Sequence, residues 1–112
     1  MTFPLQGITV LECTHAVMGP SAGLLLADMG ANVIHIEPLE GDATRRLKGF
    51  GTGYFTFFNR NKKSLSLNLK SEQGRQLFYE LVKTADVVLE NFGPGTMERL
   101  GLGYEALAVQ NE

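Results

Sequence analysis

An amide and an aromatic ring, two groups that commonly bind ligands, follow a short apolar segment late in the chain. Residues 87–90 read Val-Val-Leu-Glu, and Asn91, Phe92 and Gly93 come next. We expect a short buried strand over residues 87–90, and ligands of open α/β sheets bind just beyond the carboxyl ends of strands. Asn91, Phe92 and the backbone N–H groups around Gly93 are therefore candidates for contacts with a ligand.

Basic side chains are the second set with a possible chemical role. They fall into two groups and one isolated position, which are Arg45, Arg46 and Lys48, then Arg60, Lys62, Lys63 and Lys70, and finally Arg99. They are either solvated surface charges or contacts for phosphate, because arginine offers a planar fork to phosphate and lysine a point charge. Beside Asn91 and Phe92, such charges suit a nucleotide with several phosphates.

The first strand-to-helix turn contains Cys13 and His15. A nucleophile and its base need a third group that orients the base, and no such partner is evident in the sequence. We therefore expect Cys13 to be buried as a small apolar side chain and His15 to make a structural hydrogen bond. Two histidines and one cysteine form no metal-ligand spacing, so no metal is expected.

The same turn lacks the glycine pattern of a dinucleotide-binding site. That pattern is Gly-x-Gly-x-x-Gly, whereas this turn offers only Gly19 and Gly23. Glu37 stands at the end of the next expected strand, where an acid would bind a ribose. Because the glycines are missing, NAD and FAD are not the expected ligands.

The elements that must position these residues follow from the hydrophobic pattern. We expect a strand over residues 8–12, a helix that begins at Pro20 and is capped by Gly30, and a strand over residues 33–36. The helix has apolar residues at i, i+3, i+4 and i+7. They are Ala22, Leu25, Leu26 and Met29. Strand, helix and strand in this order predict a βαβ unit with parallel strands.

An irregular stretch separates this unit from the second half of the chain. Residues 39–63 hold four glycines and five aromatic residues, and we expect a long loop pinned by its aromatic side chains. Residues 64–69 alternate between polar and apolar, which predicts a half-buried strand at a sheet edge. Ser71 is the expected N-cap of the helix that follows. The apolar face of that helix consists of Leu77, Phe78, Leu81 and Val82.

Two further helices are expected near the end of the sequence. Thr96 can cap a short helix over residues 97–100, which Gly101 ends, and another helix begins at Tyr104. The complete order of elements predicts an α/β fold with a doubly wound, mainly parallel sheet of Rossmann-like character and flanking helices.

Length, charge and cysteine content narrow the class of protein. The 112 residues suffice for one domain, and a formal charge of −2 argues against a nucleic-acid-binding protein. A single cysteine allows no intrachain disulfide and fits a reducing compartment. The first residues form no leader, and no apolar run approaches the about 20 residues of a membrane helix. We therefore expect a cytoplasmic protein that does not bind membranes.

Several blocks of sequence, taken in order, resemble a known family. The blocks are Pro4-Leu5-x-Gly7-Ile8-x-Val10-Leu11, Leu26-Ala27-Asp28-Met29-Gly30-Ala31, Asn59-Arg60-Asn61-Lys62-Lys63-Ser64-Leu65, Ala85-Asp86-Val87, Glu90-Asn91-Phe92-x-Pro94-Gly95 and Met97-x-Arg99-Leu100-Gly101. Over residues 4–107 the chain resembles the N-terminal part of the family III CoA-transferases. That family includes formyl-CoA and carnitine CoA-transferases, the bile-acid-inducible protein F type and α-methylacyl-CoA racemase.

The resemblance implies that residues 1–112 are the N-terminal segment of a large, Rossmann-like CoA-binding domain. It also implies an interlocked homodimer for the full-length protein, with acyl-CoA and a small carboxylic acid as partners and no nucleic acid. Contacts with coenzyme A are implied at ten positions. They are Val17, Met18, Leu67, Asn68, Leu69, Lys70, Asn91, Phe92, Gly93 and Arg99.

The implied reaction moves CoA from an acyl-CoA donor to a carboxylic acid. The family's catalytic aspartate lies downstream of residue 112, where it attacks the acyl-CoA carbonyl and gives a mixed anhydride and then an aspartyl-CoA thioester. None of Asp28, Asp42 and Asp86 matches that residue, and Glu90 is expected to be structural. These 112 residues alone are therefore not expected to catalyse the transfer.

Three alternatives remain open from the sequence. The chain is a segment of an acyl-CoA racemase, a non-catalytic module that binds CoA or a nucleotide, or a truncated fragment with no activity of its own. A racemase would use acid and base residues further along the chain instead of a nucleophile.

Overall fold

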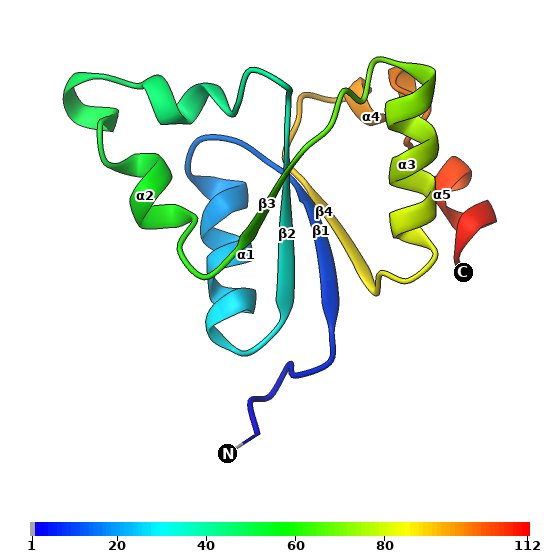
Figure 1. Cartoon of the computed structure of the whole chain (residues 1–112), viewed down its shortest axis with the longest axis horizontal. Coiled ribbons are helices and arrows are strands. Elements are labelled where there is room, and N and C mark those ends of the chain that lie inside the picture. Colours follow the sequence, from blue (N-terminus) through cyan, green and yellow to red (C-terminus); the bar gives the residue numbers. More distant parts are fainter. Residues whose placement is uncertain (1) are drawn as a thin grey trace.

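A parallel sheet with helices on both sides forms the centre of the molecule (Figure 1), in a computed structural model that describes residues 2–112. The strands lie in the order β3-β2-β1-β4 and are all parallel. Their bounds are β1 (Thr9–Cys13), β2 (Asn32–Glu37), β3 (Lys63–Ser66) and β4 (Val87–Glu90). The helices are α1 (Met18–Asp28), α2 (Tyr54–Phe58), α3 (Glu72–Val82), α4 (Thr96–Arg99) and α5 (Tyr104–Gln110), with two 3-10 helices, η1 (Ala43–Arg46) and η2 (Gly49–Gly51).

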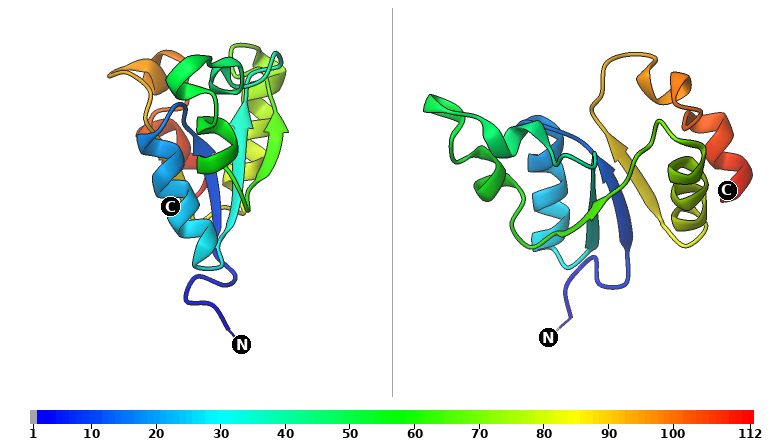
Figure 2. Two further views of the ribbon diagram at one scale, coloured as in Figure 1. Left: turned by 90° about the vertical axis from the view of Figure 1, so that its left-hand side faces the viewer. Right: turned by 45° about the horizontal axis from the view of Figure 1, so that its top comes forward.

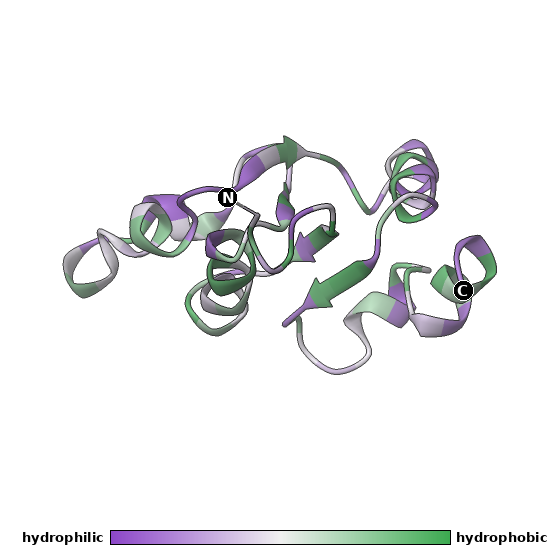
Figure 3. Cartoon of the chain, turned by 90° about the horizontal axis from the view of Figure 1, so that it is seen from below, coloured by the Kyte–Doolittle hydropathy of each residue, from purple (hydrophilic) through white to green (hydrophobic). Residues whose placement is uncertain are grey.

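The two faces of the sheet pack against different layers. Alternation along β1 sends Leu11 and Cys13 into one core with Phe78 of α3, while Val10 packs with Ala27 of α1 in a second core. Figure 2 shows α1 and α2 on one side of the sheet and α3 and α5 on the other. In Figure 3, apolar residues gather along the strands between these two layers. The sheet is therefore doubly wound, and the predicted fold class is confirmed.

The strand order places a topological switch point between β1 and β4. The chain passes from β1 to β2 and then to β3 on one side, and it returns to place β4 on the other side of β1. Ligands of doubly wound sheets bind in the crevice at the carboxyl ends of the strands at such a point. The carboxyl ends of the strands lie at the top in Figure 1.

The predicted apolar face of α1 is only partly correct, because Leu26 packs against the Val10 core but two other members of that face are exposed. Leu25 is 62% exposed and Met29 is 41% exposed. The buried face instead consists of Gly19, Pro20, Gly23, Leu24 and Ala27. Most of these residues are small, so α1 approaches the sheet closely, and Leu25 and Met29 turn outward.

Residues 39–63 are not the structureless loop that was predicted. They contain η1, η2 and α2, and none of the α2 side chains is fully buried. Phe50 is almost completely exposed, whereas the ring of Phe55 packs under the Arg45 guanidinium at 3.8 Å. This stretch therefore has local structure, and only part of its aromatic set anchors it.

Both edge strands are more exposed than the sequence pattern predicted. All four residues of β3 are exposed, and burial begins only after it, at Leu67. In β4 only Val88 and Leu89 are partly buried, although its predicted bounds are correct. Within residues 2–112, β3 and β4 each pair with one neighbouring strand, so no strand pairs with their outer edges.

The caps of the later helices differ in one case from the prediction. Ser71 caps α3 as expected, because its Oγ accepts a hydrogen bond from Gly74 N at 2.9 Å. For α4 the N-cap is Gly95, with φ +81°, and Thr96 is the first helical residue. Among residues 2–112, no helix has the length and apolar character needed to cross a membrane.

Candidate functional site

A cleft of about 660 Å³ lies at the carboxyl edge of the sheet. Four segments line it, each of which follows a different strand. They are residues 14–16 after β1, residues 36–47 at and after the end of β2, residues 67–70 after β3, and Phe92 after β4. Thr96 and Leu100 of α4 complete the lining. This is the position at which a doubly wound sheet binds its ligand.

The turn after β1 has a strained backbone conformation. Ala16 has φ +64°, a left-handed conformation that costs a non-glycine residue about 1–2 kcal/mol. Two side chains hold the turn: Thr44 Oγ1 accepts from Ala16 N at 2.9 Å, and Asn91 Oδ1 accepts from His15 N at 3.0 Å. Strain that surrounding groups maintain is typical of functional sites.

Phe92 stands beside this turn at the end of β4. Its ring is tilted against the His15 ring, with centroids 5.7 Å apart. Its backbone N–H donates to Glu90 Oε2 at 2.8 Å, so Glu90 shapes the loop as the structural residue that was predicted. For His15, the observed hydrogen bonds run through its backbone to Asn91.

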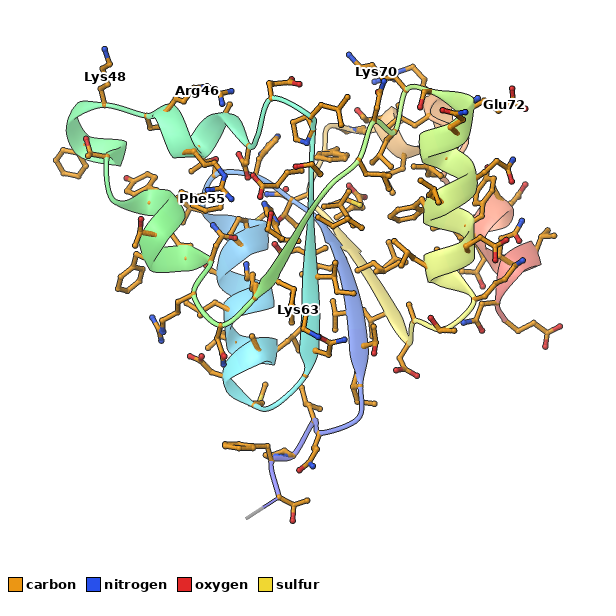
Figure 4. All side chains as sticks on the ribbon, in the orientation of Figure 1. Arg46, Lys48, Phe55, Lys63, Lys70 and Glu72 are labelled. Carbon is orange, nitrogen blue, oxygen red and sulfur yellow. The ribbon has the colours of Figure 1, made fainter. Side chains whose placement is uncertain are left out.

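The segment after β3 supplies the opposite side of the cleft. Leu67 is buried, and Asn68 Oδ1 accepts from Lys70 N at 3.1 Å, which fixes a turn before α3. Figure 4 shows the Lys70 side chain at the top of the molecule, above the carboxyl ends of the strands. An apolar wall with a lysine at its mouth suits a ligand that has both an apolar part and an anionic part.

Buried charges connect the sheet to the wall that residues 36–47 form. Glu12 and His35 face each other in register on β1 and β2, and His35 Nδ1 lies 2.5 Å from Glu12 Oε2. The other ring nitrogen, Nε2, lies 3.0 Å from Asp42 Oδ2. Lys62 Nζ closes the cluster at 2.8 Å from Glu12 Oε1. All four side chains are almost completely buried.

The protonation states in this cluster follow from its contacts. Burial alone would lower the pKa of His35, but hydrogen bonds to Asp42 and Glu12 outweigh it and raise that pKa to about 9. Burial would raise the pKa of Asp42, but hydrogen bonds from His35 and Thr44 lower it to about 2. At neutral pH the imidazolium of His35 therefore lies between two acidic side chains.

A second ion pair attaches the same wall to β2. Arg45 Nε donates to Glu37 Oε1 and Arg45 Nη2 to Glu37 Oε2, both at 2.7 Å. Hydrogen bonds from Arg45, and then from Ser64 and the backbone of Asp42, lower the pKa of Glu37 to about 2 against the opposing effect of burial. Glu37 is thus fully engaged by protein groups, which leaves it no role at a ribose.

Comparison with known proteins decides the family. Residues 5–112 match the family described as CoA-transferase family III, which is nearly the whole chain. The chain belongs to CoA-transferase family III. It corresponds to an N-terminal portion of that family's proteins, because it spans about 27–29% of the length of the curated relatives it matches.

The relatives in family III are named for CoA transfer. The chain is 44% identical to formyl-CoA:oxalate CoA-transferase of Streptomyces avermitilis over 96% of its own length. It is 47% identical to acetyl-CoA:oxalate CoA-transferase of Acetobacter aceti, again over 96% of its length, and covers 29% of that protein.

Solved structures of the family share the fold. A hypothetical protein (Rv3272) from Mycobacterium tuberculosis is 48% identical, with a TM-score of 0.92, and the match covers 98% of this chain and 31% of that one. A CAIB/BAIF family protein from Brucella suis is 39% identical, with a TM-score of 0.89, and covers 99% of this chain and 32% of that one.

The cleft at the carboxyl edge of the sheet brings together five of the ten residues that the sequence predicted for the site. Its lining includes Leu67, Asn68, Leu69, Lys70 and Phe92. The other five lie beside the cleft and do not line it. They are Val17, Met18, Asn91, Gly93 and Arg99. Contact with CoA at all ten positions stays a prediction.

These five residues have identifiable local roles. Val17 is the N-cap of α1, Met18 is 75% exposed, and Gly93 O accepts from Thr96 N at 3.1 Å. Arg99 Nη2 donates to Thr96 Oγ1 at 3.0 Å, which directs the guanidinium toward a residue of the cleft. The Asn91 amide binds the backbone of His15 through both its oxygen and its nitrogen.

Sequence reasoning missed most of the wall contributed by residues 36–47. Thr44 is the clearest case, since it is buried and holds the Ala16 turn. No local pattern marks this threonine, because its partner lies 28 residues away. The 3-10 helix that places it starts at an Asp42 cap, and this Asx-type cap is the one signal available beforehand.

The three aspartates of the chain bind other protein groups, and its one cysteine is buried. Asp28 pairs with Arg60, Asp42 pairs with His35, and Asp86 accepts from Thr9 N at 2.9 Å. Cys13 is buried as predicted, and burial, with Glu12 and Glu90 nearby, raises its pKa to about 12. Within residues 2–112, no cluster of three or more His, Cys, Asp or Glu side chains is arranged to hold a metal ion.

Proposed function

We propose that this chain is the CoA-binding N-terminal segment of a family III CoA-transferase and that its cleft receives coenzyme A or acyl-CoA. The full-length protein then transfers CoA from an acyl-CoA donor to a carboxylic acid acceptor. The observation that carries the proposal is the convergence of Leu67–Lys70 and Phe92 on one cleft at the carboxyl edge of the sheet.

The lining of the cleft matches the chemistry of coenzyme A. Leu67, Leu69 and Leu100 give an apolar surface for the pantetheine arm, and Phe92 gives a flat ring at the rim. Lys70 at the mouth and Arg99 on α4 supply positive charge for phosphates. Two acidic residues of the wall, Asp42 and Glu37, are paired with His35 and Arg45, which offsets their negative charge beside the ligand. Glu40, the third acidic residue of the lining, lies outside these two ion pairs.

The chemical step lies outside residues 2–112. None of the three aspartates in this part of the chain is free to attack an acyl-CoA carbonyl, since Asp28, Asp42 and Asp86 are all engaged. The proposal therefore assigns binding to this segment and assigns the nucleophilic aspartate to chain downstream of residue 112. An interlocked homodimer and a cytoplasmic location belong to the same proposal for the full-length protein.

Calorimetric titration with a ligand series tests the binding proposal. The folded polypeptide that carries these residues is titrated with CoA, 3′-dephospho-CoA and pantetheine. We expect saturable binding of CoA and binding about 10- to 100-fold weaker once the phosphates are removed, the range for charged hydrogen bonds. A folded protein that binds none of the three ligands contradicts the proposal, and equal binding of pantetheine removes the phosphate contacts from it.

A second measurement separates transfer from racemisation. The polypeptide extended beyond residue 112 is incubated with an acyl-CoA donor and then quenched. A covalent thioester between protein and CoA supports a transferase. Exchange of the proton next to the acyl carbonyl, without any covalent intermediate, supports the racemase alternative.

A further inference from the structure

The part of the cleft wall that follows β2, residues 38–47, has little apolar anchorage. Between Asp42 and Leu47, the only buried residues are Asp42 and Thr44, and both are polar. Leu47 is 41% exposed. Polar contacts fix this wall to β2: the ion pair between His35 and Asp42, the one between Glu37 and Arg45, and a hydrogen bond from Asp42 N to Glu37 Oε1.

Thr44 links this wall to the turn that follows β1. Its hydroxyl oxygen accepts the hydrogen bond from Ala16 N, 28 residues away. Its own backbone N–H donates to Asp42 Oδ1 at 2.8 Å, while the other carboxylate oxygen of Asp42 holds His35. A continuous series of contacts thus leads from the buried imidazolium through Asp42 and Thr44 to Ala16.

Ala16 needs this support because its backbone is strained. A left-handed alanine returns to an ordinary conformation when nothing compensates its cost. Asn91 holds the preceding residue, His15, from the β4 side, and Thr44 holds Ala16 itself from the β2 side. Both supports act on the segment that lines the cleft beside Phe92.

We propose that Thr44 and Asp42 are positioning residues for the CoA site. Thr44 holds the Ala16 turn in its left-handed conformation, and the buried His35–Asp42 ion pair holds Thr44 in place. The inference rests on the proposed function in so far as CoA is the ligand of this cleft. It adds that the wall's position depends on the buried cluster of Glu12, His35, Asp42 and Lys62.

The charges of the cluster explain why an ion pair is suited to fixing the position of the cleft wall. Two acids and two bases face one another, so each basic side chain of the cluster has an acidic partner within 3.0 Å. A buried ion pair is destabilising unless its geometry is good, so it favours one arrangement of its wall over displaced ones. An apolar contact in the same place would tolerate sliding of the exposed segment.

The test uses variants that change one contact at a time. Thr44→Val removes the acceptor for Ala16 N while keeping the shape, and Thr44→Ser restores a hydroxyl. Asp42→Asn removes the charge opposite His35. Asp28→Asn is the matched control, because Asp28 pairs with Arg60 at 2.9 Å but is exposed. Each protein is examined for the hydrogen-exchange rate of the Ala16 amide by NMR, for the CoA dissociation constant and for melting temperature.

We expect Thr44→Val and Asp42→Asn to speed exchange of the Ala16 amide about 10-fold or more and to weaken CoA binding about 3- to 10-fold, the scale of one hydrogen bond. Thr44→Ser restores both values, and Asp28→Asn changes neither. Unchanged exchange and unchanged CoA affinity in Thr44→Val overturn the inference while the proposed function stands. If the parent protein is folded but does not bind CoA, the proposed function fails and so does the assignment of these residues to a CoA site. Faster Ala16 exchange in Thr44→Val would then support only their hold on the turn.

Discussion

The side chain of Asn91 binds the backbone of His15 at two points. Its Oδ1 accepts from His15 N at 3.0 Å, and its Nδ2 donates to His15 O at 3.1 Å. The two residues are 76 positions apart in the sequence, yet this pairing extends the contact between β1 and β4 beyond the strands themselves. The switch point of the sheet is thus closed by an amide side chain, and the cleft begins directly beside it.

This pairing predicts that Asn91→Ala destabilises the fold. Both His15 backbone groups lose a partner, and we expect a loss of about 1–3 kcal/mol in the free energy of unfolding. Urea unfolding measures it. Asn68→Ala is the comparison, since Asn68 is exposed and makes only a local bond to Lys70 N, and it should cost less. If Asn91→Ala keeps full stability but abolishes CoA binding, the amide is a ligand contact and not a structural tie.

Substitution of Gly23 is expected to lower the free energy of unfolding more than substitution of Asn91 does, because Gly23 packs against the buried cluster. A Cβ at this position would overlap the Glu12 carboxylate and lie 3.2 Å from Lys62 Nζ. Gly23→Ala therefore displaces Glu12 and leaves buried charges without good partners, which costs about 3–5 kcal/mol. Gly53→Ala is the control, because nothing lies within 4 Å of a Cβ there. Equal melting temperatures for the two variants would contradict the described packing of Glu12 against α1.

The sequence predicts the order of elements well because local signals mark them. The Ser71 cap, the Gly30 turn with φ +101° and the bounds of β4 are all confirmed. The apolar face of α1 is predicted only in part, because the spacing of large residues favours Leu25 and Met29, whereas Gly19 and Gly23 let the helix approach on their side. Close packing of glycines is a property of the partner surface, and the helix sequence alone does not reveal it.

The candidate site is only partly predictable for a similar reason. Phe92 and Lys70 follow strands, so their place at the carboxyl edge could be inferred from the order of elements. The wall at Asp42 and Thr44 depends on His35 and Ala16, which are far from it in sequence or face it from other strands. Pairings of this kind have no local pattern, and they appear only when the sheet order is known.

The buried His35 predicts a specific dependence of stability on pH. The pKa of His35 is about 9 in the folded protein against 6.5 for a free histidine. Between pH 6.5 and pH 9 the folded protein therefore keeps a proton on His35 that the unfolded protein has lost. The stabilisation is fully present below pH 6.5 and is lost as pH rises through 9. At about 1.36 kcal/mol per pKa unit, the loss is of the order of 3 kcal/mol.

Urea unfolding at intervals from pH 6 to pH 9.5 measures this loss. His35→Gln is the control, since it keeps a polar group but cannot be protonated, and its stability should change less over the same interval. A parent protein whose stability is constant or rises between pH 6.5 and pH 9 would show that His35 is not a buried cation.

Phe92 offers a test of its contact with the ligand. Phe92→Ala should weaken CoA binding about 10-fold through loss of the ring at the rim of the cleft. Phe57→Ala is the matched control, because Phe57 lies on α2, is 60% exposed and does not line the cleft. A marked fall in melting temperature with unchanged CoA affinity would instead assign Phe92 to the core, because it packs against the buried cluster that includes Leu11 and Phe78.

The central claim is that the cleft at the carboxyl edge of the sheet binds coenzyme A, and NMR titration of the ¹⁵N-labelled protein with CoA tests it most directly. We predict saturable shifts at the amides of residues 14–16, 67–70 and 91–93. Little change is expected along the groove of about 560 Å³ beside β4 and α5, which Tyr104 and Asn111 line. Shifts confined to that second groove, or no saturable shift in the folded protein, would contradict the claim.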